Sequence, residues 1–186
     1  MGVVSWSGSL NRNHRSFLPA LRCAQFVIVV FSMWVCVPSI CEAKENCPWL
    51  NEATAAGAVE GPVIATVTHP NNNKDDATCE FIHRSGSATT ALQIEVETMS
   101  GARGAFAAYL DRCGANGVPL KAIGNEAVTC SFDDRNKKGW ASEQVVGRVR
   151  DRAFTVWISS NAESPVRSAL REEARKIAEQ VAGFLF

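Results

Sequence analysis

The chain has 186 residues, of which 46% are hydrophobic and 20% are charged, and its formal net charge at pH 7 is zero. This composition is ordinary for a globular protein, and the length fits one domain once a targeting segment is subtracted. The lack of net positive charge argues against a nucleic-acid binder held by phosphate electrostatics, so no nucleic-acid partner is expected.

The first 43 residues have the order of an export signal. A basic region with three arginines contains no acidic residue before Glu42, and an apolar run over 24–37 follows it. A proline then ends the run, and small residues precede the expected cleavage point. The apolar run is shorter than the ~20 residues of a membrane-spanning helix. We therefore predict a signal peptide over 1–43 and a single domain over 44–186, secreted or periplasmic. The alternative is an uncleaved signal that anchors the protein in the membrane.

Four cysteines remain after that cut, Cys47, Cys79, Cys113 and Cys130. An even number in a small exported domain predicts a disulfide framework. Four cysteines allow three connectivities. However, a Thr-Cys-x-Phe motif occurs twice, at 78–81 and 129–132, and each copy has one cysteine upstream. This repetition favours the pairs Cys47–Cys79 and Cys113–Cys130, and it suggests two pseudo-related halves.

The first half of the domain predicts a helix and three strands. Asn46 can cap a helix and Pro48 suits its first turn, so the helix is expected to begin there and end near Gly57. Residues 63–68 and 78–83 are strand-like, with a polar surface loop between them. Residues 91–97 alternate with period two, which places one set in the core (Leu92, Ile94 and Val96) and the other toward water (Gln93, Glu95 and Glu97).

The second half repeats this order. Residues 101–113 predict a helix whose apolar side carries Phe106, Leu110 and Cys113. A strand follows within 123–132, and a hairpin is expected from 144–150 and 153–159.

The chain ends in an amphipathic helix. Ser164 is its cap and Pro165 lies in its first turn, and apolar residues recur at three- and four-residue steps from Val166 to Val181. Charged residues are expected on its outer face: Arg171, Glu172, Arg175, Lys176 and Glu179. The element order is then α-β-β-β-α-β-β-β-α. This order predicts an α+β domain, an antiparallel sheet with packed helices.

These segments together resemble a family of small bacterial cell-envelope domains. The resemblance rests on the Cys-Pro-Trp-Leu segment at 47–50, the Thr-Cys-x-Phe strands, Ile-Gly-Asn-Glu-Ala at 123–127, the Val-Val-Gly-Arg-Val-Arg hairpin at 145–150 and the closing helix. The family includes actinobacterial lipoproteins of unknown function and the extracellular sensor domains of receptor-type Ser/Thr kinases, some with a PsbP-like fold. The chain departs from the usual pattern at Asn125, where the family more often has aspartate. The resemblance implies an envelope location and ligand sensing, and it supplies no catalytic residues.

Five residues are candidates for ligand binding. Asn125 and Glu126 follow a glycine and could hold a ligand, or they could serve a backbone turn. Arg148 and Arg150 could form part of a cationic patch, or they could lie on a solvated sheet face. Trp140, like Trp157, could stack on a sugar or another flat ligand, or it could pack in the core.

No catalytic or metal-binding motif accompanies these candidates. His69 and His83 lack metal-ligand spacing, no Gly-x-Ser-x-Gly elbow is present, and no cofactor is expected. The sequence therefore favours a non-catalytic domain that binds an unknown small molecule or envelope protein. The alternative is an envelope hydrolase or a thiol-dependent redox enzyme.

Overall fold

The structure is a computed structural model that describes residues 45–70, 73, 75–99, 103–132, 139–162 and 167–186. The expected signal peptide over 1–43 lies outside the described residues. So do Ser164, Pro165 and Val166, which were expected to begin the last helix.

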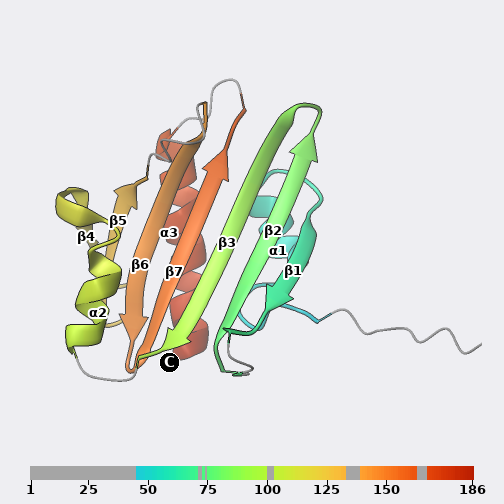
Figure 1. The fold of residues 1–186 in the computed structure, drawn as a ribbon. Helices are drawn as coiled ribbons and strands as arrows, with labels where there is room; N and C mark the ends of the chain where they lie inside the picture. Colours follow the sequence, from blue (N-terminus) through green and yellow to red (C-terminus); the bar gives the residue numbers. More distant parts are fainter. Residues whose placement is uncertain (1–44, 71–72, 74, 100–102, 133–138, 163–166) are drawn as a thin grey trace, which may run out of the picture. The chain divides into compact units, whose positions relative to one another are not determined.

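One antiparallel sheet of seven strands organises the domain, in the order β1-β2-β3-β7-β6-β5-β4 (Figure 1). The strands are β1 (Ile64–Thr68), β2 (Ala77–Ser85), β3 (Ala88–Thr98), β4 (Val118–Leu120), β5 (Glu126–Ser131), β6 (Ala141–Val149) and β7 (Arg152–Ser160). The helices are α1 (Glu52–Ala58), α2 (Arg103–Leu110) and α3 (Arg167–Leu185), with a 3₁₀ turn, η2 (Gly114–Asn116), after α2. This architecture confirms the α+β prediction. The short edge strand β4 was not predicted from the sequence.

The helices α1 and α3 pack on one side of the sheet, which we call the covered face; in Figure 1 the strands pass in front of both helices. The predicted alternation in β3 is confirmed, since Leu92, Ile94 and Val96 are fully buried on this side. β7 contributes Phe154, Val156 and Ile158 in register with them. The apolar side of α3, which includes Ile177 and Val181, closes this core. Removing this apolar surface from water is the main stabilising contribution to the fold.

The opposite side, the open face, is covered by α2 only toward β5 and β6. Phe106 and Cys113 pack there against Cys130, Val146 and Ala153 in a second, smaller core. Phe106 and the partly buried Leu110 lie on the predicted apolar side of that helix, but the helix ends at Leu110, so Cys113 follows it. Toward β1, β2 and β3 the side chains of the open face are exposed or half-buried.

Both predicted disulfides are present. Cys47 bonds to Cys79 with a Cα–Cα distance of 5.7 Å, and Cys113 bonds to Cys130 with a Cα–Cα distance of 5.6 Å. However, they lie on opposite sides of the sheet, since Cys79 belongs to the covered core and Cys130 to the core under α2. Their strands also differ in place: β2 borders β3, whereas β6 separates β5 from β7. The repeated motif therefore occupies two non-equivalent positions.

The first helix begins later than predicted. Its cap is Asn51, whose Oδ1 accepts a hydrogen bond of 2.8 Å from the backbone N–H of Thr54. The prediction that Asn46 caps this helix is wrong. Both asparagines suit a cap. However, Cys47 is bonded to Cys79 on β2, and Trp49 and Leu50 are buried in the core. These contacts hold the segment before Asn51 against the sheet, so the helix begins only after Asn51.

Candidate functional site

Four of the five predicted site residues gather around the turn between β6 and β7. The side-chain oxygen of Asn125 accepts a hydrogen bond of 2.6 Å from the backbone N–H of Arg150. The backbone N–H of Asn125 donates to the carbonyl of Arg148 at 2.8 Å. Arg148 also forms an ion pair with Glu126. Gly124 adopts a positive φ of 60°, and a Cβ there would lie 2.4 Å from the carbonyl oxygen of Arg148. The Ile-Gly-Asn-Glu segment therefore fixes a backbone turn.

A shallow apolar hollow of about 310 Å³ lies beside this turn, between α2, β4 and β5. Asn125 and Glu126 reach its rim, but their side-chain oxygens already have partners within the protein. The fifth predicted residue, Trp140, precedes β6 at the end opposite Arg148 and does not join this group.

Another hollow, of about 300 Å³, lies on the open face. It is lined by Gln93, Glu95, Arg112, Phe132, Gln144, Thr155 and Trp157. The strand register brings these residues together, because Trp157 lies directly opposite Gln93 on one side and Gln144 on the other. In the next row, Thr155 lies opposite Glu95. The rings of Trp157 and Phe132 meet edge to face at 5.8 Å, which gives the hollow an aromatic wall.

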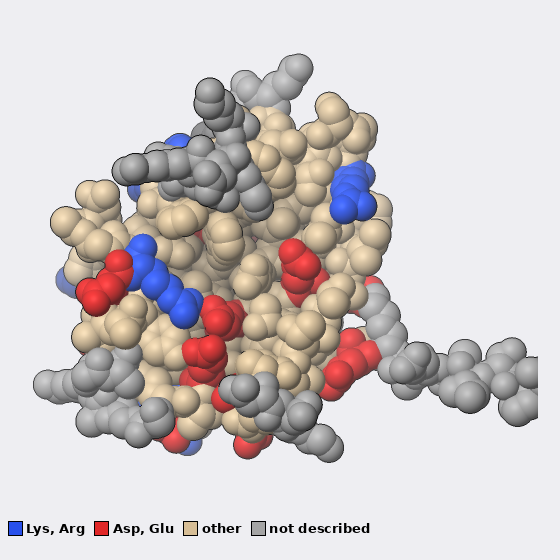
Figure 2. All heavy atoms as spheres, in the orientation of Figure 1, with Lys and Arg blue, Asp and Glu red and all other residues tan. Residues whose placement is uncertain are grey.

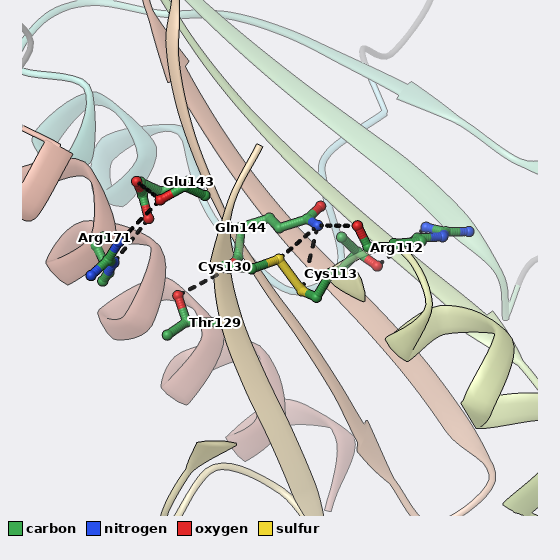
Figure 3. The surroundings of a disulfide bond; sticks show 9 residues. Arg112, Cys113, Thr129, Cys130, Glu143, Gln144 and Arg171 are labelled. Carbon is green, nitrogen blue, oxygen red and sulfur yellow. Dashed lines mark hydrogen bonds and ion pairs between the residues drawn. A yellow bond between two sulfur atoms is a disulfide. The ribbon is translucent and has the colours of Figure 1, made fainter. Parts of the chain in front are cut away.

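The amide of Gln144 links this hollow to the second disulfide (Figure 3). Its nitrogen lies 3.0 Å from Sγ of Cys130 and 3.6 Å from Sγ of Cys113, and it donates to the carbonyl of Arg112 at 3.4 Å. Figure 3 shows the amide oxygen turned away from these partners. Gln144 is 7% exposed, so its orientation is fixed by contacts that are almost entirely within the protein.

Charged groups close the side of the hollow next to α2. Arg112 donates to the Glu95 carboxylate at 2.9 Å and to the Thr155 hydroxyl at 3.4 Å. Its guanidinium also lies 4.9 Å from the centre of the Tyr109 ring. Burial raises the pKa of Tyr109, and the hydrogen bond that its hydroxyl donates to Glu97, together with the charge of that carboxylate, raises it further. These contacts hold the end of α2 against β3.

Most of this lining was not predicted as a site from the sequence. Gln93 and Glu95 were expected to face water, and they do face the open side, where they are half-buried. Trp157 was considered for stacking or for the core, and the structure places it in the wall of the hollow. The alternation within β3 and β7 was readable from the sequence. The pairing of β3 with β7 could not be predicted from the sequence.

The remaining candidates for chemistry lie elsewhere. Nδ1 of His83 hydrogen-bonds the carbonyl of Pro62, and the ring of His69 bonds the carbonyl of Asp76 and the carboxylate of Glu45. Within the described residues no group of three or more His, Cys, Asp or Glu could hold a metal ion. The side chains that line the open-face hollow can hydrogen-bond a ligand and stack on a ring, and they include one ion pair, between Arg112 and Glu95.

Neither of two comparisons with known proteins identifies relatives: no protein-family model matches the chain, and no curated protein matches it. In the described part of the chain no helix is both long enough and apolar enough to cross a membrane. Since a fold alone does not imply a function, the geometry of the site itself is the guide to function.

Proposed function

We propose that this protein is an exported, disulfide-stabilised domain that binds a small ligand, without catalysis, in the hollow of the open face. The observation that carries this proposal is the convergence of polar side chains from three strands beside the Trp157–Phe132 wall. Binding sites for small molecules combine apolar surface with a few fixed polar groups, and their volumes start at about 300 Å³. Since a cavity of about 150 Å³ holds benzene, this hollow suits one or two rings.

The state of its hydrogen-bonding groups distinguishes this hollow from the one beside α2 and β4. The side-chain oxygens of Asn125 and Glu126 would have to break internal contacts to bind a ligand. Among the described residues, by contrast, nothing hydrogen-bonds the amide of Gln93 or the amide oxygen of Gln144. Such groups can bind a ligand without the cost of first breaking a bond within the protein.

Three observations support export and a sensor-like role. Two disulfides suit an oxidising compartment, and the first 43 residues have the order of a secretory signal. The resemblance of the sequence to extracellular sensor domains supports a role in ligand sensing. The thiol-dependent alternative requires a free thiol, whereas all four cysteines of the described part are bonded in pairs.

A thermal-shift screen of small polar and aromatic compounds on oxidised protein tests this proposal. A ligand at 100 times its Kd stabilises a protein by about 2.7 kcal/mol. We expect that a hit will raise the melting temperature of the wild type and of a Trp140→Phe control, and that Trp157→Ala will abolish the shift. Equal shifts in the wild type and in Trp157→Ala would exclude the open-face hollow as the site.

A further inference from the structure

A second hollow continues the first across the open face. It has a volume of about 170 Å³ and is lined by Thr66, Thr68, Thr78, Glu80 and Gln93. Gln93 belongs to the lining of both hollows, so they are neighbours on the same surface. We call the two hollows together the cross-strand groove. Figure 2 looks onto this face, which is mostly uncharged, with both acidic and basic side chains spread across it.

The register explains the direction of the groove. One transverse row runs from strand to strand through directly opposed residues: Thr66 on β1, Glu80 on β2, Gln93 on β3, Trp157 on β7 and Gln144 on β6. Neighbouring strands lie roughly 4.8 Å apart, so a row across five strands spans about 19 Å. This is longer than a one- or two-ring ligand needs, and it suits a linear chain of rings.

The chemistry of the groove changes along its length. The β7–β6 end has the aromatic wall, and the β1–β2 end has three threonine hydroxyls and the Glu80 carboxylate. A hydroxyl group both donates and accepts hydrogen bonds, an amide offers both roles on separate atoms, and a carboxylate accepts. A ligand rich in hydroxyl groups can therefore satisfy every polar group in this set.

The charges of the groove disfavour an acidic ligand. Its lining contains two carboxylates, Glu80 and Glu95, and one cation, Arg112, which is already paired with Glu95. Among the described residues, no hydrogen bond or ion pair joins Glu80 to another side chain. Bringing a phosphate or a uronic acid next to this carboxylate would add like-charge repulsion.

The direction of the groove also disfavours a peptide added as a strand. Such a peptide runs along a sheet edge and gains its affinity from backbone hydrogen bonds. This groove crosses the strands on the face of the sheet, where the backbone groups are already paired with neighbouring strands.

We propose that the cross-strand groove binds a neutral linear oligosaccharide. One sugar ring packs on Trp157, and the following units extend past Gln93 toward Thr66 and Thr78. This inference rests on the proposed function, because it assigns a ligand class and a second subsite to the same site.

Titration calorimetry with neutral, uronic-acid and amino-sugar oligosaccharides of increasing length tests the proposal. For neutral oligosaccharides we expect affinity to increase with length until the groove is filled. Trp157→Ala should abolish binding at every length. The double variant Thr66→Val and Thr78→Val removes two hydroxyls from the far end, and it should weaken long ligands about tenfold and leave disaccharides unchanged. Thr89→Val, on the same side of β3 but outside both hollows, is the matched control.

Several results would overturn the oligosaccharide assignment. These are a preference for acidic or amino sugars, an affinity that stops increasing at the disaccharide, and a threonine double variant that binds long chains like the wild type. If no oligosaccharide binds but another ligand does so in a Trp157-dependent manner, the oligosaccharide assignment fails and the proposed function stands. If Trp157→Ala changes no binding at all, both fail.

Discussion

Glu143 is the most informative position for a test of stability, because its carboxylate is fully buried on the covered face. Its Oε2 lies 2.9 Å from Nε of Arg171 on α3, and Nη1 of Arg167 lies 3.7 Å from Oε1. Ser131 donates to the same carboxylate at 2.6 Å. Figure 3 shows this group and the Gln144–disulfide group on opposite sides of β6. Arg171 was expected on the exposed side of the last helix, and its side chain is 48% exposed, but its guanidinium also reaches Glu143 on the sheet.

The two partners of this ion pair differ in exposure, so their removal has different costs. The Glu143 side chain is 0% exposed and the Arg171 side chain 48% exposed. In Arg171→Ala the buried carboxylate keeps Ser131 and the more distant Arg167 as partners. Removing one partner of a buried ion pair lowers the free energy of unfolding by about 3–5 kcal/mol. We expect the lower value, about 3 kcal/mol, since these partners remain. Glu143→Gln leaves an arginine that can turn into water, so we expect a loss of about 1 kcal/mol.

Urea unfolding followed by far-UV circular dichroism measures these differences, and an unchanged m-value confirms that the unfolding transition is comparable. For a domain of this size about 3 kcal/mol corresponds to a decrease of roughly 10 °C in melting temperature. Arg175→Ala is the matched control on the same helix. Among the described residues Arg175 pairs with Glu172 and Glu179 on the surface, where ion pairs contribute little. If Arg171→Ala and Arg175→Ala lower stability equally, the argument from the buried carboxylate is refuted.

Two further predictions concern the open face. Replacing Cys113 and Cys130 with alanine should lower the free energy of unfolding by about 3 kcal/mol, because their bridge closes a separation of 17 residues; a loss below about 1 kcal/mol in urea unfolding would contradict this. Tyr109 is the only tyrosine of the chain, so its ionisation can be followed directly by ultraviolet absorbance. Burial and Glu97 raise its pKa above the ordinary value of 10, and Glu97→Gln should lower that pKa. The unfolded chain loses this proton first, so stability should decrease as pH rises above about 10; an ordinary titration of Tyr109 would contradict the contact with Glu97.

The sequence by itself determined the features that depend on short spacings. Period-two alternation identified Leu92, Ile94 and Val96 as core, and three- and four-residue steps identified the apolar side of the last helix. The repeated cysteine motif gave the correct disulfide pairs, and the order of elements gave the α+β class. The alternation in the strand and the periodicity of the helix are readable because neighbours in the chain hold a fixed geometry in these elements.

Only the tertiary structure decided which strands are neighbours, and the candidate site depends on that choice. Gln93, Trp157 and Gln144 form one row because β7 lies between β3 and β6. Nothing in their local sequence marks them as a group. The same holds for Glu143, whose partner Arg171 looked like a surface residue of an amphipathic helix. Strand pairing and helix docking are set by the packing of the whole core, so they place together side chains that are far apart in the chain.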